Sequence, residues 1–158
     1  MDEYWLSAYR EDRDHLLAGV AAGGPFTRVL DIGCNSGPLR RRLREAFGAD
    51  FFYTGVDYNE EALARARAHA ASDARATFLL VDLRLALPFE TDAFDLAVST
   101  SVLQVIAPDV LRVTLDELHR VAGGRLVVVE DYGDGHTHTQ RGWEHNYPEW
   151  VTRCYQQT

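Results

Sequence analysis

The chain has 158 residues, 46% of them hydrophobic and 25% charged, which is the length and composition of one globular domain. Its 24 acidic and 16 basic residues give a formal net charge of −8, which argues against nucleic-acid partners because basic surfaces bind these. No apolar run approaches the roughly 20 residues of a membrane span, so we expect no membrane partner. The N-terminus is acidic, unlike that of a secretion signal, and two cysteines are too few for a disulfide framework. We therefore expect a cytoplasmic protein.

Five short apolar runs alternate with helical patterns, which predicts an α/β fold with a parallel sheet covered by helices. The runs are continuously apolar, as expected of strands buried on both faces. In chain order we expect a helix over Tyr4–Val20, a strand over Arg28–Ile32, a helix over Pro38–Phe47, a strand over Phe52–Asp57, a helix over Asn59–Ala71, strands over Thr77–Asp82 and Phe94–Ser99, a helix over Pro108–Ala122 and a strand over Arg125–Glu130.

Several helix ends carry recognisable signals. Pro38 favours a first helical turn and Gly48 a C-terminal stop, while Asn59 is placed to cap the following helix. The segment 87–90 contains Pro88 and is expected to be a loop before the fourth strand. Four arginines of one helix are expected to face solvent: Arg40, Arg41, Arg42 and Arg44.

Carboxylates stand at the ends of four predicted strands: Asp31, Asp57, Asp82 and Glu130. Ligands of an open parallel sheet bind at the carboxyl ends of its strands, near the switch in strand order. This edge has no basic residue before Arg84. It therefore disfavours phosphates and tolerates a cationic ligand.

The turn after the first strand is rich in residues that allow a positive φ. Gly33 and Gly37 permit a tight turn that a ligand can approach closely, and Asn35 tolerates a left-handed conformation. A dinucleotide fingerprint would need Gly at position 35 as well as 33, and Gly instead of Pro38. Asp57 nevertheless lies twenty residues past Gly37, where a carboxylate suits ribose hydroxyls. The pattern predicts a binding site for a ligand that has an adenosine-type ribose and no pyrophosphate.

From Arg28 to Asp131 the sequence resembles the class I S-adenosylmethionine-dependent methyltransferases. The resemblance implies a Rossmann-like, doubly wound parallel sheet with strand order 3-2-1-4-5. It implies S-adenosyl-L-methionine as cofactor and S-adenosyl-L-homocysteine as product. The motifs that carry it are Val29–Gly37, Gly55–Asn59, Leu80–Leu83, Leu87–Phe89, Phe94–Val105 and Leu118–Glu130.

The resemblance also implies a cofactor-binding role for eleven residues. They are Asp31, Gly33, Cys34, Asn35 and Gly37 around the methionine part and the ribose edge, Asp57 on the ribose hydroxyls, Tyr58 beside the adenine, Asp82 and Leu83 at the adenine amino group, and Ser99 and Thr100 below the sulfonium. Cys34 is expected to contribute its backbone rather than a nucleophilic thiol, because no basic residue neighbours it in the sequence.

Methyl transfer from a sulfonium needs alignment above all, and a base only where the acceptor still carries its proton. The catalytic residue therefore stays unassigned, with five candidates: Glu130, Asp131, Tyr132, His136 and His138. The spacing of His136, His138 and His145 could ligate zinc or iron, but ordinary loop residues surround them and we predict no metal site.

The family fold continues past its fifth strand with a helix and two antiparallel strands. Only 27 residues follow Asp131 here, without a clear hairpin pattern, so strands six and seven are expected to be missing or replaced. A second copy of the chain or a partner protein is then expected to cover strand five. We expect one domain over residues 1–158, with core motifs over 28–131 and an aromatic, histidine-rich tail over 132–158.

The expected function is transfer of a methyl group to an O, N or C atom of a small molecule. One alternative is a methyltransferase-fold module that binds the cofactor or a partner protein without turnover. The other is a nicotinamide-dependent oxidoreductase, which the incomplete glycine fingerprint and the acidic edge disfavour.

Overall fold

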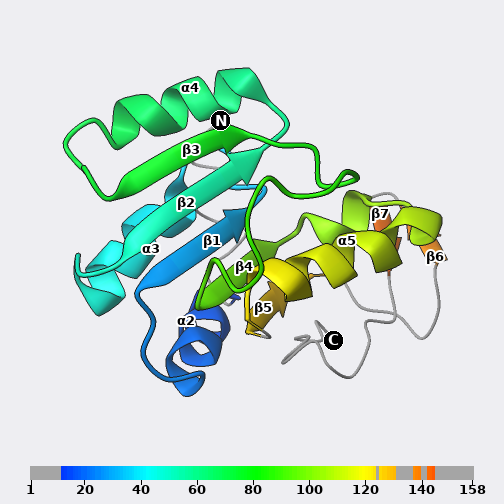
Figure 1. The fold of residues 1–158 in the computed structure, drawn as a ribbon, viewed down its shortest axis with the longest axis horizontal. Coiled ribbons are helices and arrows are strands. Elements are labelled where there is room, and N and C mark those ends of the chain that lie inside the picture. The colour runs from blue at the N-terminus through cyan, green and yellow to red at the C-terminus, as the bar shows by residue number, and fades with distance from the viewer. Residues whose placement is uncertain (1–11, 124, 131–136, 140–141, 145–158) are drawn as a thin grey trace.

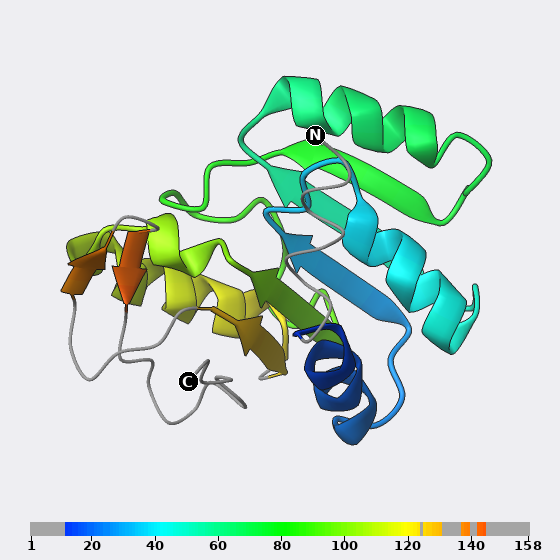
Figure 2. The same cartoon turned by 180° about the vertical axis from the view of Figure 1, so that it is seen from behind.

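The computed structural model describes residues 12–123, 125–130, 137–139 and 142–144. A twisted parallel sheet with helices on both faces dominates it (Figures 1 and 2). Its elements are α2 Asp12–Ala22, β1 Arg28–Ile32, α3 Pro38–Phe47, β2 Phe52–Asp57, α4 Glu60–His69, β3 Ala76–Leu80, β4 Leu96–Thr100, the 3-10 helix η1 Leu103–Val105, α5 Pro108–Val121, β5 Leu126–Val129, β6 Thr137–Thr139 and β7 Gly142–Glu144.

The main sheet has the order β3-β2-β1-β4-β5, and all its strand pairs are parallel, as predicted. The order reverses between β1 and β4, so the chain leaves these two neighbouring strands in opposite directions across the sheet. Such a switch point is where open parallel sheets bind ligands. A ligand site is therefore expected at the segments that follow β1 and β4.

The predicted elements exist, and their ends differ by one or two residues in several cases. The bounds of β1, α3 and β2 match the prediction, and Asn59 caps α4 by accepting hydrogen bonds from the amides of Glu61 and Ala62. β3 ends at Leu80 rather than Asp82, because the chain turns where the Asp82 carboxylate accepts the Arg84 amide. Of the predicted N-terminal helix, residues 4–11 lie outside the described residues.

Two apolar clusters fill the space on the two faces of the sheet. One face packs against α5, whose Leu111, Leu115 and Leu118 are buried. The other face packs against α2, α3 and α4, with Leu43 and Leu63 fully buried there. This three-layer arrangement leaves the carboxyl ends of the strands free to hold a site (Figure 1).

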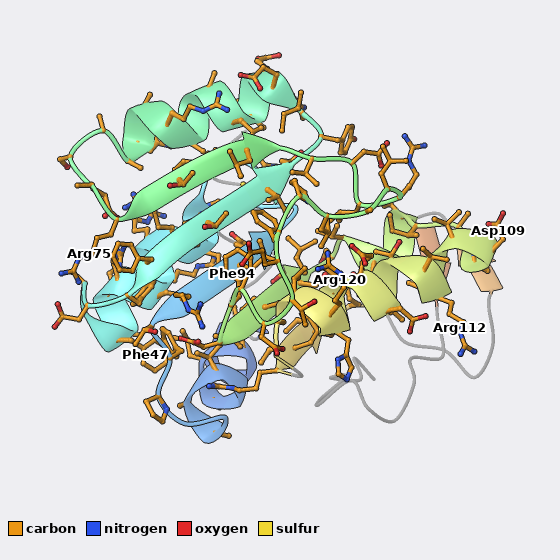
Figure 3. The ribbon with its side chains drawn as sticks, viewed as in Figure 1. Phe47, Arg75, Phe94, Asp109, Arg112 and Arg120 are labelled. Atoms are coloured by element: carbon orange, nitrogen blue, oxygen red, sulfur yellow. The ribbon has the colours of Figure 1, made fainter. Side chains whose placement is uncertain are left out.

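The loop before β4 is held by α5. Glu117 accepts the Leu87 amide at 2.8 Å, and Arg120 donates to the Leu87 and Phe89 carbonyl oxygens at 3.3 and 2.9 Å. Figure 3 shows Arg120 on α5 and Phe94 in the loop, two residues before β4, where the Phe94 amide donates to the Val121 carbonyl oxygen at 2.9 Å. The hydrogen bonds of Arg120 lower the pKa of Glu117 to about 2, so this carboxylate stays ionised at neutral pH.

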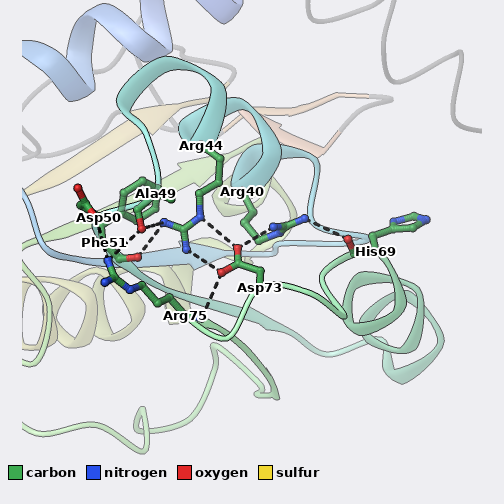
Figure 4. A network of polar contacts seen from close by, with 8 residues as sticks. All are labelled: Arg40, Arg44, Ala49, Asp50, Phe51, His69, Asp73 and Arg75. Atoms are coloured by element: carbon green, nitrogen blue, oxygen red, sulfur yellow. Dashed lines mark hydrogen bonds and ion pairs between the residues drawn. The ribbon is translucent and has the colours of Figure 1, made fainter.

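The prediction that all four arginines of α3 face solvent is wrong for Arg40 and Arg44. Both contact Asp73 beyond α4, at 2.8 Å from Arg40 Nη1 and 3.1 Å from Arg44 Nε (Figure 4). Arg44 also donates to the Phe51 carbonyl oxygen and stacks on the Phe51 ring at 4.0 Å. The reason is topological: β2 and α4 place Asp73 beside α3, although it lies 29 residues beyond Arg44.

We expect Arg44→Ala to lower the free energy of unfolding by about 1–2 kcal/mol, because it removes charge-assisted hydrogen bonds to a largely buried carboxylate. Arg41→Ala on the exposed face of the same helix should change it by less than about 0.5 kcal/mol. Urea denaturation of the three proteins measures both effects. Equal effects would contradict the role given to Arg44.

In the described residues the main sheet has five strands, so strands six and seven of the family fold are missing from it or replaced, as predicted; the tail nevertheless contains a short hairpin that its sequence pattern did not reveal. β6 and β7 pair antiparallel, from Thr137 opposite Glu144 to Thr139 opposite Gly142, and they form a sheet separate from the main one. β7 lies against η1 (Figure 2). Strands of three residues are too short for an alternating pattern to stand out in a sequence. No helix of the described ranges is both long and apolar enough to cross a membrane.

Candidate cofactor site

The turn between β1 and α3 lies at the switch point and has three residues with positive φ. Gly33 has φ 67°, Asn35 has φ 48° and Gly37 has φ 81°, as the sequence predicted for a tight turn. A Cβ on Gly33 would lie 2.2 Å from Val102 Cγ2 in the segment after β4. Glycine is therefore required at position 33 both for its conformation and for this close approach.

Asp57 links this turn to the start of α4. One carboxylate oxygen accepts the Asn35 amide and the other the Asn59 amide, each at 2.9 Å. Because a carboxylate oxygen can accept more than one hydrogen bond, each oxygen keeps the capacity to accept another. Asp57 is half-buried, and the neighbouring Tyr58 side chain is 79% exposed. The pair therefore offers two acceptors and an aromatic ring at the edge of the sheet.

Asp31 lies at the end of β1 and is buried, at 3% exposure. Its carboxylate accepts a hydrogen bond from the hydroxyl of Tyr53, which is also buried. Burial raises the pKa of Asp31 to about 7, the Tyr53 hydrogen bond opposes this rise, and the charge of Asp57 adds to it. The sequence analysis did not single out Tyr53. Its position in a strand predicted to be buried could have indicated a hydrogen bond, because buried tyrosine hydroxyls usually have a hydrogen-bond partner.

The raised pKa of Asp31 predicts a pH dependence of stability. A carboxyl whose pKa rises on folding from 3.8 to about 7 stabilises the fold at low pH, and this contribution is lost as the pH rises through about 7. We expect the free energy of unfolding to fall more steeply between about pH 4 and pH 7 in the wild type than in Asp31→Asn. Asp50→Asn, at an exposed carboxylate, should follow the wild-type curve. Parallel curves for the wild type and Asp31→Asn would contradict the prediction.

Cys34 is buried against the backbone of β2. A Cβ on Gly55 would lie 2.7 Å from Cys34 Sγ. Burial raises the pKa of the Cys34 thiol, and the nearby charges of Asp31 and Asp57 raise it further. A thiol held protonated is a poor nucleophile at neutral pH, as expected of Cys34, while a contribution of its backbone to cofactor binding stays a prediction.

Asp82 makes an ion pair that its position in the sequence did not reveal. Arg84 Nε donates to one oxygen at 2.8 Å and Arg84 Nη2 to the other at 2.6 Å. These hydrogen bonds lower the pKa of Asp82 to about 2. An amino group that approached Asp82 would therefore share the carboxylate with Arg84. The adjacent Leu83 is half-buried, and its carbonyl oxygen accepts the Thr114 hydroxyl.

The end of β4 holds Ser99 and Thr100. Ser99 is fully buried, and its hydroxyl donates to Glu130 Oε1 at 2.6 Å. Thr100 Oγ1 is buried without a hydrogen-bond partner in the described part of the chain. Burial raises the pKa of Glu130 to about 7, against the opposing hydrogen bonds from Ser99 and three backbone amides. Ser99 and Glu130 are therefore engaged with each other.

The eleven predicted cofactor residues all lie in the last residues of the first four strands or directly after them, at the carboxyl edge of the sheet. Of the five catalytic candidates, Asp131, Tyr132 and His136 lie outside the described residues, and only the backbone of His138 in β6 is described. Among the described residues, no group of three or more His, Cys, Asp or Glu side chains could hold a metal ion. The sequence analysis did not single out Tyr53, which donates to Asp31, or Val102, which lies against Gly33.

Comparison with known proteins places these features in a family. Residues 29–123 match the sequence model of the family described as "Methyltransferase domain". The chain is 35% identical to a demethylmenaquinone methyltransferase of Shouchella clausii, over 66% of the chain and 45% of that protein. It is 34% identical to a malonyl-[acyl-carrier protein] O-methyltransferase of Salmonella typhimurium, over 75% of the chain and 43% of that protein.

A solved structure agrees with these relatives. An arsenic(III) S-adenosylmethionine methyltransferase of Chlamydomonas reinhardtii matches with a TM-score of 0.57 and 28% identity, over 67% of the chain and 39% of that protein. The chain thus spans less than half the length of each of these three proteins.

Proposed function

The chain belongs to the class I S-adenosylmethionine-dependent methyltransferases, and from this membership we propose that it transfers a methyl group from S-adenosyl-L-methionine to an O, N or C atom of a small-molecule acceptor. The product of the cofactor is then S-adenosyl-L-homocysteine. We also propose that residues 1–158 act as one cofactor-binding domain, with a second copy or a partner protein beside β5, the last strand of the main sheet.

The carboxylate of Asp57 carries this proposal. Backbone amides on either side hold its two oxygens at 2.9 Å, so the carboxylate is fixed in place before any ligand arrives. Two neighbouring hydroxyls of a ribose can each donate to one of these oxygens. A nucleoside is therefore the ligand that this residue fits best.

The charge around the turn favours S-adenosyl-L-methionine over a dinucleotide. Asp57 lies close enough to Asp31 for its charge to raise the pKa of Asp31. A sulfonium ion and an ammonium group are attracted to such a negative field, whereas a pyrophosphate is repelled. Asn35 and Pro38 also stand where a dinucleotide-binding turn would have glycine.

The residues present fit this cofactor, and each has a task in binding or alignment. Asp57 would hold the ribose, the exposed Tyr58 ring would cover the adenine, and Gly33 would let the backbone of the turn approach the methionine part closely. The cofactor supplies a methyl group that is already activated by its sulfonium, so the protein has to orient the acceptor in line with it.

The names of the relatives support a small acceptor. One is named for demethylmenaquinone and the other as an O-methyltransferase of malonyl-[acyl-carrier protein], so an oxygen acceptor occurs among proteins similar to this chain. The net charge of −8 favours a small molecule over DNA or RNA as acceptor.

Isothermal titration calorimetry with S-adenosyl-L-homocysteine, S-adenosyl-L-methionine and NADH tests the proposal. We expect both adenosyl compounds to bind and NADH to leave no heat of binding. Binding of NADH alone would overturn the proposal in favour of an oxidoreductase. Binding of the adenosyl compounds without turnover on phenol, amine and carboxylate acceptors would favour a non-catalytic module.

A further inference from the structure

Glu130 follows β5 directly and is 4% exposed. Its carboxylate accepts the Ser99 hydroxyl at 2.6 Å, the Val102 amide at 2.9 Å and the Gln104 amide at 3.3 Å. These donors belong to the end of β4 and to the segment that follows it, 26 to 31 residues earlier in the chain. A single buried carboxylate therefore holds this segment from the neighbouring strand.

The segment that Glu130 holds has a backbone conformation that needs support. Ser101 has φ 56°, a left-handed value that is strained for a residue other than glycine. The Ser101 amide donates to the Val129 carbonyl oxygen at 2.9 Å, immediately before Glu130. The end of β5 thus holds both the left-handed residue and the amides that follow it.

Val102 connects this segment to the turn after β1. A Cβ on Gly33 would lie 2.2 Å from Val102 Cγ2 and 3.2 Å from Val102 Cβ, so the valine side chain lies directly against the Gly33 backbone. β1 and β4 are the two strands at which the sheet order reverses. The Val102 side chain therefore supports the backbone of the Gly33–Gly37 turn, where the cofactor is proposed to bind.

We propose that Glu130 is a positioning residue that acts through Val102 on the Gly33–Gly37 turn, and so determines the affinity of the protein for its adenosyl cofactor. This inference rests on the proposed function. It removes Glu130 from the candidates for general base, since its two oxygens are buried and occupied by a hydroxyl and backbone amides. Alignment of the turn then depends on a residue that contacts neither cofactor nor acceptor.

A double-mutant cycle on the dissociation constant of S-adenosyl-L-homocysteine, measured by calorimetry at about pH 8, tests the route through Val102. We expect each single variant to raise this dissociation constant about tenfold. Glu130→Gln loses hydrogen bonds to a charged group, and Val102→Ala loses a buried contact. We expect the double variant to be no weaker than the weaker single variant. Effects that multiply would show that the residues act independently and would overturn the proposal.

Glu117→Gln is the matched control. Glu117 also accepts the amide of a distant loop residue, Leu87, at 2.8 Å, but it holds the loop before β4 instead of the segment at Gly33. We expect it to leave the affinity for S-adenosyl-L-homocysteine unchanged. A loss equal to that of Glu130→Gln would mean that general destabilisation explains both, and would overturn the proposal. Unchanged affinity in Glu130→Gln would overturn it as well.

Amide hydrogen exchange separates this proposal from the proposed function. The Asn35 amide bonds to Asp57 and is not a partner of Glu130, so faster exchange there in Glu130→Gln reports on coupling to the turn without any ligand. We expect faster exchange in Glu130→Gln and wild-type exchange in Glu117→Gln. Unchanged exchange would overturn the coupling even if the cofactor binds. If the wild type does not bind S-adenosyl-L-homocysteine, the proposed function fails while this readout still decides the coupling.

Should Glu130→Gln not fold, Val102→Ala carries the same test. Faster exchange of the Asn35 amide in that variant supports the route through Val102, and unchanged exchange overturns it.

Discussion

Asp57→Ala is expected to weaken the binding of S-adenosyl-L-homocysteine by about 1.5–3 kcal/mol, roughly 10- to 150-fold, through the loss of charge-assisted hydrogen bonds to the ribose. The same change releases the amides of Asn35 and Asn59, which the carboxylate holds at 2.9 Å. The turn after β1 and the start of α4 then lose their common partner. Calorimetry gives the affinity, and urea denaturation shows how much of the protein remains folded.

Glu61→Ala controls for the loss of one negative charge near the same helix end. The Glu61 side chain is 82% exposed and pairs only along α4 with Arg65 among the interactions that the structure describes. Its removal should leave the affinity for S-adenosyl-L-homocysteine unchanged. Unaltered binding in Asp57→Ala, or equal losses in both variants, would refute the assignment of Asp57 to the ribose.

Gly33→Ala is expected to lower the free energy of unfolding by about 3–5 kcal/mol, the sum of two separate costs. The residue has φ 67°, where a side chain is strained, and its new Cβ would lie 2.2 Å from Val102 Cγ2. Valine is branched at Cβ and has little freedom to move its methyl groups away. The backbone of the turn or of the segment after β4 must therefore shift, and the affinity for the cofactor should fall with the stability.

Gly48→Ala separates the two costs. Gly48 has a similar φ of 79°, but a Cβ there would meet no atom within 4 Å. With ψ −164° this is a region that only glycine adopts readily, so we expect the conformational cost alone, about 1–3 kcal/mol. Denaturation curves of the two variants measure the difference, which reports the contact with Val102. Similar losses in both would mean that this contact is unimportant.

The gathering of the candidate site residues at one edge of the sheet could be predicted from the sequence because it follows from topology alone. Parallel strands end at the same edge of a sheet, so residues directly after strands must gather there. Asp31 and Asp57 therefore meet at the turn of Gly33 and Gly37, as expected. The cap at Asn59 was also predictable, since capping involves residues only two or three positions apart.

The partners of these residues were not predictable in the same way. Asp82 is paired with Arg84, although the sequence analysis regarded the carboxylate as available to a ligand. Glu130 was one of the candidates for a base, yet its oxygens are occupied by donors that lie 26 to 31 residues earlier in the chain. A residue type in a pattern shows which hydrogen bonds a side chain can make, and only its neighbours in space show which ones it makes.

Taken by itself, the sequence determined the class of fold, the order of the elements and the edge of the sheet at which the candidate site residues gather, because hydrophobic periodicity and local turn signals depend on near neighbours along the chain. The tertiary structure alone decided the pairing of Tyr53 with Asp31, of Arg44 with Asp73, and of Gly33 with Val102. These contacts join residues 22 to 69 positions apart, so they exist only once the strand order has brought the segments together.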